Sequence, residues 1–515
     1  MAKSSYDFLF SLIKSLSPSE KRHFRLSAQG KYGQKEKLFM QLFDVLDKQK
    51  IYDETKLNKK IPSLKTSQLS NLKANLYRQI LTSLRKQQIN NNPIINLREI
   101  LDFALVLYNK GMYKASLNML EKAKKIATTN QLHTHLYLLL EIERKIESQH
   151  ITGSTGPKAT QLIQETNEIL GVIERENELA NLSIFLYGSF LNHGYVKTKE
   201  EFKNLTHLFE ERLPKLDHDK LGFIDKQSLY KSYVWYYSMV HDFANNYKFA
   251  KKWRDLFYDN PEMISTQAPN FLKAYHNVLA ALYMTQRIDK FGPAYEDFCA
   301  FEEKYKISLT QNEHSLYQLF KFIHGINYYF ITADYHLSID FTDELIKILE
   351  KNPYNWDDHR ILVLYYKIGC ISFGQNNLDQ AASFLNKVTN DSMTEFRQDI
   401  QCYSRILNLI VHFDLGNDIL VSYKIKSVYR FLLQRNQLQN VLQEIFKFLR
   451  RTPQIKEENL KSEFQTLRDK LYKLKKDPFE RRPFLYLDII SWLDSKINSV
   501  TMQEAIKRNL NRKNN

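Results

Sequence analysis

The chain has 515 residues and a net charge of +16, and glycine (14) and proline (12) are scarce. This length excludes one ordinary core and favours about three domains or one extended repeat array, and the scarcity of chain breakers predicts an all-α protein. No run of about 18 uncharged apolar residues occurs, which excludes a membrane span. The three cysteines, Cys299, Cys370 and Cys402, have no metal-ligand spacing, so we expect them to be reduced and buried in a cytoplasmic protein.

Charge is concentrated at the two ends of the chain. Residues 1–92 contain 18 Lys and Arg against 7 Asp and Glu, and residues 451–515 contain 15 against 9. The 358 residues between them are almost neutral, with 41 against 42. We therefore expect an acidic partner, nucleic acid included, to bind at one of the two ends.

The first ninety residues read as a compact basic helical module. The pattern predicts helices over residues 4–14, from Ser17 onward, over 34–48, after Asp53, and over 66–87. Ser17, Pro18 and Glu20 form the strongest start signal, because serine caps a helix, proline suits its first position and the glutamate closes a capping box.

The last of these helices has two distinct sides. Leucine and isoleucine recur at three- and four-residue steps from Leu69 to Leu84, which predicts one buried stripe, and polar residues from Ser67 to Arg85 lie opposite. A short helix, a turn and a long helix with a polar basic face also give the outline of a helix-turn-helix DNA-binding module. The residues that could neutralise phosphates are Lys21, Arg22, Arg25, Lys73, Arg78 and Arg85. The alternative is a solvated basic surface, such as the polar cap that a repeat array needs at each end.

A different pattern begins after the polar segment "QQINNNP" (87–93), which we take as a domain boundary. Amphipathic helical hairpins follow over residues 93–450, with turns expected at Gly111, Asn245, Gln286, Ala333, Asn376 and Gly416. The interval between the first two turns is long enough for three further hairpins. We therefore expect seven or eight irregular hairpins, closed by a basic helical cap and tail over residues 451–515.

Two of these segments resemble tetratricopeptide repeats. One copy has Phe103, Ala104, Gly111, Tyr113, Leu120 and Ala123 at the motif positions, with Ser116 in place of the usual alanine. A clearer copy has Tyr365, Ile368, Gly369, Leu378, Ala381, Leu385 and Val388. The resemblance implies an all-α superhelix of stacked hairpins over residues 93–450 and says nothing of the ligand.

The amino-terminal segments carry a second resemblance. "LIKSLSPSEKRHFRL", "LFDVLDKQKIYDETKL" and "NLYRQILTSLRK" are together similar to the amino-terminal module of a group of uncharacterised bacterial helical-repeat proteins. That resemblance would extend to the whole chain. It implies no activity and no functional residues.

Two local motifs have structural explanations. "GSTGPKAT" (153–160) lacks the spacing and the Gly-Lys pair of a phosphate loop, so we interpret it as a linker between hairpins. In "NWDDHR" (355–360), we expect Asn355 to cap a helix whose first turn holds Asp357 and Asp358.

The carboxyl-terminal "FLYLDIISWLDSKI" (484–497) predicts one capping helix, and the final nine residues predict a frayed end.

The sequence favours a noncatalytic scaffold that binds a protein or a peptide. No catalytic motif, cofactor motif or metal-binding motif occurs, so we expect no cofactor and no enzymatic activity. A DNA-binding regulator that uses residues 1–92, with the repeats as sensor, is the alternative. An enzyme whose site is assembled from distant residues is the third hypothesis.

Overall fold

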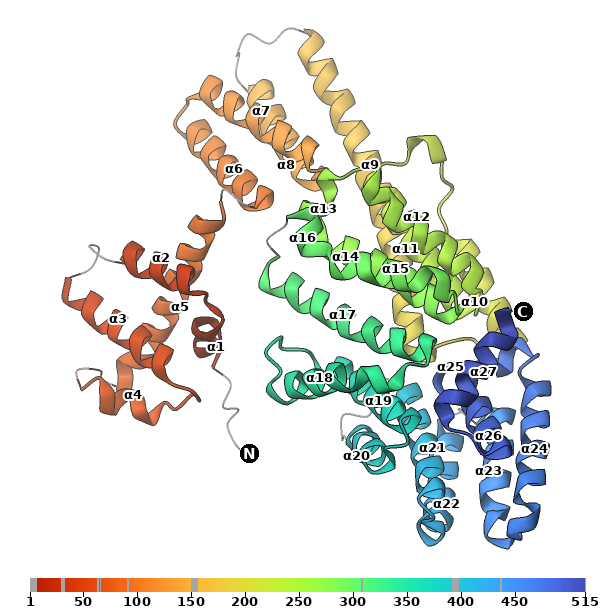
Figure 1. Ribbon diagram of the computed structural model, residues 1–515. Helices are drawn as coiled ribbons and strands as arrows, with labels where there is room; N and C mark the ends of the chain where they lie inside the picture. The colour runs from red at the N-terminus through yellow and green to blue at the C-terminus, as the bar shows by residue number, and fades with distance from the viewer. Residues whose placement is uncertain are drawn as a thin grey trace. The chain divides into compact units, whose positions relative to one another are not determined.

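The computed structural model describes residues 7–28, 33–62, 64, 66–89, 92–149, 156–306, 309–390, 398–435 and 438–514, and every regular element in these ranges is a helix. Helices that are neighbours in the sequence pack against one another along the chain (Figure 1). The protein therefore has an all-α helical-repeat fold. None of the described helices is both long enough and apolar enough to span a membrane.

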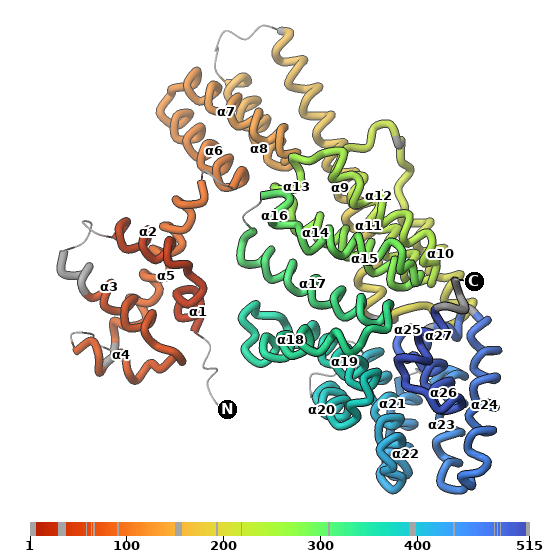
Figure 2. The backbone as a smooth tube through the Cα atoms, in the orientation of Figure 1, coloured from red at the N-terminus to blue at the C-terminus, as the bar shows by residue number. Residues whose placement is uncertain are grey.

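The contacts divide the chain into two compact units, Met1–Ile173 (unit 1) and Glu174–Asn515 (unit 2). The boundary between the two units falls inside the helix α9 (Gly156–His193). The path of the backbone can be followed in Figure 2. The boundaries expected at residues 92 and 450 stay predictions.

Unit 1 begins with the amino-terminal module and ends with repeat hairpins. The module's core consists of apolar side chains from its first five helices, and a separate core joins the next three. The helices of unit 1 before α9 are α1 (Phe8–Ser15), α2 (Pro18–Ala28), α3 (Gly33–Lys48), α4 (Thr55–Lys60), α5 (Thr66–Gln88), α6 (Pro93–Asn109), α7 (Tyr113–Thr129) and α8 (His133–Gln149).

Local signals place the module's helices. The Glu20 N–H donates to Ser17 Oγ (3.2 Å), and the Ser17 N–H donates to the Glu20 carboxylate (2.7 Å), so the predicted capping box is confirmed. In α5, Leu69, Leu76 and Ile80 are buried, and the polar side from Ser67 to Arg85 is exposed. The two-sided character predicted for this helix is therefore confirmed.

The first hairpin shows why a serine replaces alanine at its packing position. Ala104 of α6 and Ser116 of α7 are both buried, and Ser116 Oγ donates to the backbone oxygen of Ala104 (2.7 Å). The hydroxyl satisfies its hydrogen bond inside the helix pair, so the substitution leaves no buried polar atom unpaired. Phe103, expected at an aromatic packing position, is instead 48% exposed.

Unit 2 is built from the carboxyl-terminal half of α9 and the helices that follow it. Two large aromatic-rich cores lie within it, one centred on α14, α17 and α19 and one on α21, α23 and α26. The α-helices are α10 (Lys199–Arg212), α11 (Phe223–Met239), α12 (Phe243–Tyr258), α13 (Glu262–Thr266), α14 (Ala268–Met284), α15 (Ile288–Cys299), α16 (Phe301–Tyr305), α17 (Gln311–Thr332), α18 (Ile339–Lys351), α19 (Asp358–Gly374), α20 (Leu378–Thr389), α21 (Gln398–Asp414), α22 (Asp418–Gln434), α23 (Asn440–Arg451), α24 (Glu457–Leu474), α25 (Arg482–Tyr486), α26 (Ile489–Asn498) and α27 (Met502–Asn514). Short 3₁₀ segments are η1 (His218–Lys220), η2 (Tyr335–Ser338), η3 (Thr452–Gln454) and η4 (Pro478–Glu480).

Most of the predicted turns are confirmed. Gly111, Gln286, Ala333, Asn376 and Gly416 all have positive φ values between helices. The turn expected at Asn245 is wrong, because the positive φ is at His241 and Asn245 lies inside α12. The N-cap of α12 is Asp242, whose carboxylate accepts a hydrogen bond from the Asn245 N–H (3.1 Å).

The described residues between Gly111 and Asn245 do not form three further hairpins. Between the α6–α7 pair and the α11–α12 pair, the described α-helices are α8, the 38-residue α9 and α10. One helix of this length replaces the helix-turn-helix pairs that an even repeat would supply. The sequence has no proline between Pro157 and Gly194, which is consistent with a single long helix that includes Gly171 and Gly188.

The carboxyl-terminal segment differs from the expected cap. The single helix predicted over 484–497 is two helices, because Leu487 is extended and Asp488 caps α26 by accepting from the Ser491 N–H. The helix α27 buries Ala505 and Ile506 and continues through residue 514, so the helical backbone extends into the segment predicted to fray. In Figure 1, α26 and α27 form the dark blue end of the chain.

Candidate functional site

Two of the six basic residues predicted for anion binding are neutralised by aspartates of α3. Lys21 forms an ion pair with Asp47 (2.7 Å), and Arg25 pairs with Asp44 (2.8 Å) and with Asp47 (3.7 Å). These contacts join α2 to α3. Their charges are therefore compensated within the module.

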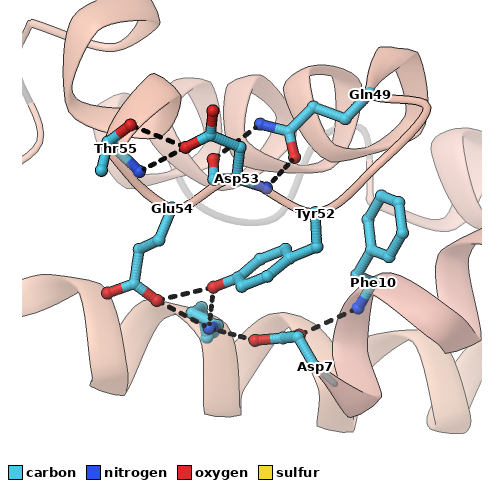
Figure 3. Close-up of polar contacts among 8 residues, drawn as sticks. Asp7, Phe10, Gln49, Tyr52, Asp53, Glu54 and Thr55 are labelled. Atoms are coloured by element: carbon cyan, nitrogen blue, oxygen red, sulfur yellow. Dashed lines mark hydrogen bonds and ion pairs between the residues drawn. The ribbon is translucent and has the colours of Figure 1, made fainter. Parts of the chain in front are cut away.

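A third predicted residue, Lys73, lies in a polar network at the base of α5. Its ammonium bonds to the Asp7 carboxylate, donates to the Tyr52 hydroxyl (2.7 Å) and lies 3.4 Å from Glu54. The side chains of Asp7, Tyr52 and Glu54 converge in Figure 3. Burial alone would raise the pKa of Asp7, but hydrogen bonds from Lys73 and from the Phe10 N–H hold that pKa below its usual value. Lys73 therefore fastens α5 to α1 and to the segment before α4.

The neighbouring turn in Figure 3 is also closed by side chains. Gln49 donates to the Asp53 backbone oxygen (3.0 Å) and accepts from the Asp53 N–H (3.1 Å), while the Asp53 carboxylate accepts from Thr55. Burial, followed by the hydrogen bond to Glu54, raises the pKa of Tyr52 to about 12, so this phenol is neutral. These contacts hold the segment before α4 against α1 and α5, so the network has a structural role.

Arg22, Arg78 and Arg85 remain as exposed cations. Within the described ranges, no carboxylate forms an ion pair with any of the three. Arg78 and Arg85 are seven residues apart on the exposed side of α5, which places them on one face. On the opposite side of α5, His23 and Ser27 of α2 contact Ser83.

The two local motifs are helix starts. Residues 153–155 of the expected linker lie outside the described residues. The rest of the motif belongs to α9, which begins at Gly156. In its first turn, Lys158 forms an ion pair with Glu143 (2.8 Å). In "NWDDHR", the capping residue is Asp357, whose carboxylate accepts from the Arg360 N–H (2.9 Å). Asn355 has a positive φ and precedes the cap, so the prediction that it caps the helix is wrong.

The helix α6 leaves an apolar surface uncovered. Four large apolar side chains occupy one half of its circumference, because α7 and α8 pack against the other half around Leu97 and Ala104. The exposed fractions in this α6 face are Ile94 37%, Phe103 48%, Leu105 38% and Val106 57%. Solenoid helices normally use such residues to contact the next repeat.

Unit 2 contains a partly enclosed cavity of about 470 Å³. Its wall is formed by α14, α17, η2, α19 and α21 of the repeats and by the carboxyl-terminal segment from α24 to α27. Trp492 of α26 and Ile506 of α27 contribute apolar surface, and Lys367 of α19 contributes a cation. The last helices therefore close the inside of the repeat stack.

Hydrogen bonds and ion pairs hold this closing segment in place. Trp492 Nε1 donates to Asp414 (3.0 Å), and Lys496 pairs with the same carboxylate (2.8 Å). On α27, Lys507 pairs with Asp334 (2.7 Å). Each bond joins residues that lie at least 78 positions apart, and no local pattern in the sequence predicts such pairs.

A polar chain leads from the cavity wall into the core. Lys367 Nζ donates to Asn327 Oδ1 (2.6 Å), the Asn327 amide contacts His324 Nδ1 (3.3 Å), and His324 Nε2 contacts His276 Nδ1 (2.8 Å). Because the amide nitrogen donates to Nδ1, His324 carries its proton on Nε2 and donates it to His276. Burial, followed by the nearby Lys367 charge, lowers the pKa of His276 to about 4, so both imidazoles are neutral.

The cysteines and metal-binding groups add no further site. All three cysteines are free thiols; Cys402 is buried, and Cys299 and Cys370 are half-buried. Burial raises the pKa of Cys370, which lines the cavity, to about 12. Among the residues that the structure describes, no three His, Cys, Asp or Glu side chains are grouped to hold a metal ion.

Comparisons with known proteins identify no relative. No family model, curated protein or solved structure matches this chain.

Proposed function

We propose that this protein is a noncatalytic helical-repeat scaffold that binds an α-helix of a partner protein. The observation that carries the proposal is the α6 face, where Ile94, Phe103, Leu105 and Val106 are exposed together. These side chains alternate with charged residues on the same surface of α6, and such a mixture of apolar and polar groups is usual in protein interfaces. A helix offers the matching shape, because its apolar stripe fits against the side chains of another helix.

Unit 2 provides an example of such binding within the chain. The amphipathic α27 packs Met502, Ile506 and Leu510 against the apolar core, and Lys507 pairs with Asp334 at the edge. Apolar contacts at the centre with a charged pair at the rim are also the usual arrangement of a protein interface. We expect the α6 face to hold its partner in the same way.

A matched pair of variants tests the proposal. The double variant Phe103→Glu, Val106→Glu places two negative charges on the α6 face, and Asn118→Glu, Thr134→Glu makes the same charge change at exposed positions of α7 and α8. The tagged full chain is used to capture proteins from cells of its source, with recovery quantified by mass spectrometry. We expect at least one captured protein to fall by tenfold or more with the first variant and to be retained by the second. If no captured protein depends on the α6 face, the proposal is wrong.

DNA binding through α5 is the second candidate, and the exposed Arg78 and Arg85 favour it. A helix that enters the major groove needs basic and amide side chains on one free face, and Asn71 and Asn75 share this one. The test is a mobility shift with random duplex DNA at two salt concentrations. We expect binding that weakens with salt and with Arg78→Ala, Arg85→Ala. Absence of binding at low salt contradicts this candidate.

Three finer assignments belong to the same proposal. The small Gly369, where an added Cβ would lie 3.0 Å from Leu385, supports repeats of tetratricopeptide type. Membership of the group of bacterial helical-repeat proteins rests on the amino-terminal segments quoted above. The three free thiols support a reducing compartment such as the cytoplasm.

A further inference from the structure

The cavity of unit 2 has the size and lining of a small-molecule site. Its volume of about 470 Å³ falls within the range of roughly 300–1,000 Å³ that is usual for ligand pockets. Most of the wall is aromatic or aliphatic, including Phe330, Ile410 and Trp492. A ligand with an apolar body would find matching side chains along this part of the wall.

The charged groups in the wall determine which polar end such a ligand would have. Lys367 and Lys475 are the cations of the lining, and Asp488 is its single carboxylate. Asp488 already accepts from the Ser491 N–H as the cap of α26. Cys370 is a neutral thiol because burial raises its pKa to about 12. The wall thus carries an excess of one positive charge and attracts an anionic group more than a cationic one.

The polar chain described above holds Lys367 in position. Its ammonium is fixed by Asn327 and lies 5.8 Å from the Tyr283 ring centre and 5.6 Å from that of Phe330. The buried His324 orients Asn327 in turn, because its ring contacts the Asn327 amide. A cation fixed at the edge of an apolar cavity is preorganised for a carboxylate, since little side-chain entropy is lost when the acid binds.

We propose that this cavity binds an amphiphilic monocarboxylic acid, with its apolar body among the aromatic side chains and its carboxylate beside Lys367. The site lies in unit 2 and does not use the α6 face, so it is independent of the scaffold proposal. It adds a small-molecule ligand whose apolar body would contact α27 through Ile506 and Leu510. Binding of the acid would therefore stabilise the closed carboxyl-terminal segment by mass action.

Three probes of equal chain length separate the chemical classes. Dodecanoate, dodecylamine and dodecanol are titrated into the full-length protein below their micelle or solubility limits, and the heat of binding is measured. We expect dodecanoate to bind at one site per chain and at least tenfold more tightly than the amine and the alcohol. Equal binding of all three, or no binding of dodecanoate, overturns the proposal.

Two variants with a matched control locate the site. Lys367→Met removes the charge while keeping much of the side-chain length, and we expect it to weaken dodecanoate binding by at least tenfold; Lys347→Met removes an exposed lysine of α18 and should have no effect. Val363→Phe adds volume at the wall and should weaken binding of dodecanoate without removing a charge. Thermal unfolding of each free variant establishes that it is folded. Wild-type affinity in both folded Lys367→Met and folded Val363→Phe overturns the assignment to this cavity.

Discussion

The imidazoles of His276 and His324 lie inside unit 2 and are held neutral by burial. The hydrogen bond between them needs one ring to accept, and His276 also stacks on Phe320, with ring centres 4.1 Å apart. A proton added to either ring would place a charge in the core without a carboxylate partner among the contacts described for the pair. This polar pair therefore makes the stability of unit 2 sensitive to acid.

We expect unit 2 to lose stability as the pH falls from 6.5 toward 4. Above pH 6.5 both the folded and the unfolded states keep His276 neutral; between that value and the folded pKa of about 4, only the unfolded state takes up the proton. The cost from His276 at pH 5 is about 2 kcal/mol. Urea unfolding followed by tryptophan fluorescence measures the free energy of unfolding of unit 2 at each pH. The signal reports on unit 2 because all four tryptophans lie in it: Trp235, Trp253, Trp356 and Trp492.

Replacement of the histidine provides the control for this pH dependence. His276→Gln should reduce the drop in the urea midpoint between pH 7 and pH 5, whereas His207→Gln, at an exposed side chain of α10, should leave the drop unchanged. An equal drop in wild type and His276→Gln would show that the acid sensitivity of unit 2 arises from other groups.

Close approaches between helices depend on glycine at a few positions. An added Cβ at Gly325 of α17 would overlap the Phe341 ring of α18 and lie 2.7 Å from the Tyr295 hydroxyl. Tyr295 also donates to the Lys321 backbone oxygen (3.1 Å), so neither neighbour can move without loss of a packed contact. In α9, by contrast, an added Cβ at Gly188 meets no atom within 4 Å.

The two glycines should respond in opposite directions to the same change. Gly325→Ala should destabilise unit 2 by about 1–3 kcal/mol through overpacking, whereas Gly188→Ala should be neutral or stabilise it by about 0.5–1 kcal/mol because alanine favours the helix. Urea midpoints read by tryptophan fluorescence measure both. If Gly325→Ala is as stable as wild type, α17 and α18 are not as close as described.

Within unit 2, the carboxyl-terminal segment connects parts that are far apart in the chain. Met502 packs against both large cores, and Tyr366 of α19 donates to the backbone oxygen of Tyr486 (2.7 Å). The same segment supplies one side of the cavity. Removal of its apolar contacts should therefore loosen a region larger than the final helix.

We expect Ile506→Gln to raise amide hydrogen exchange in α26, α27 and the cavity-lining part of α19. Full burial of an isoleucine contributes about 1.5–3 kcal/mol, and Ile506 is 4% exposed. Arg508→Gln, at an exposed position of the same helix, should leave exchange unchanged. Exchange that rises only within α27 would show that this helix is a passive end of the chain.

Features governed by neighbours within about four residues could be predicted from the sequence. The all-α class, the buried stripe of α5, the Ser17 capping box and the turns at Gly111 and Asn376 follow from periodicity, caps and backbone conformation, which are local properties. The turn expected at Asn245 and the cap expected at Asn355 are both displaced by two to four residues, because the local pattern does not distinguish between neighbouring polar residues. Several polar residues lie close together in both segments, and the observed N-caps are Asp357 and Asp242.

The tertiary structure alone decided which charges are compensated and where the cavity lies. Lys73 reads as a free cation in the sequence, yet it binds Asp7, 66 positions earlier, while Arg78 on the same helix stays exposed. The cavity wall likewise combines residues from Tyr195 to Leu510. Ion pairs and cavities depend on the packing of distant segments, and helical periodicity carries no information about which segments meet.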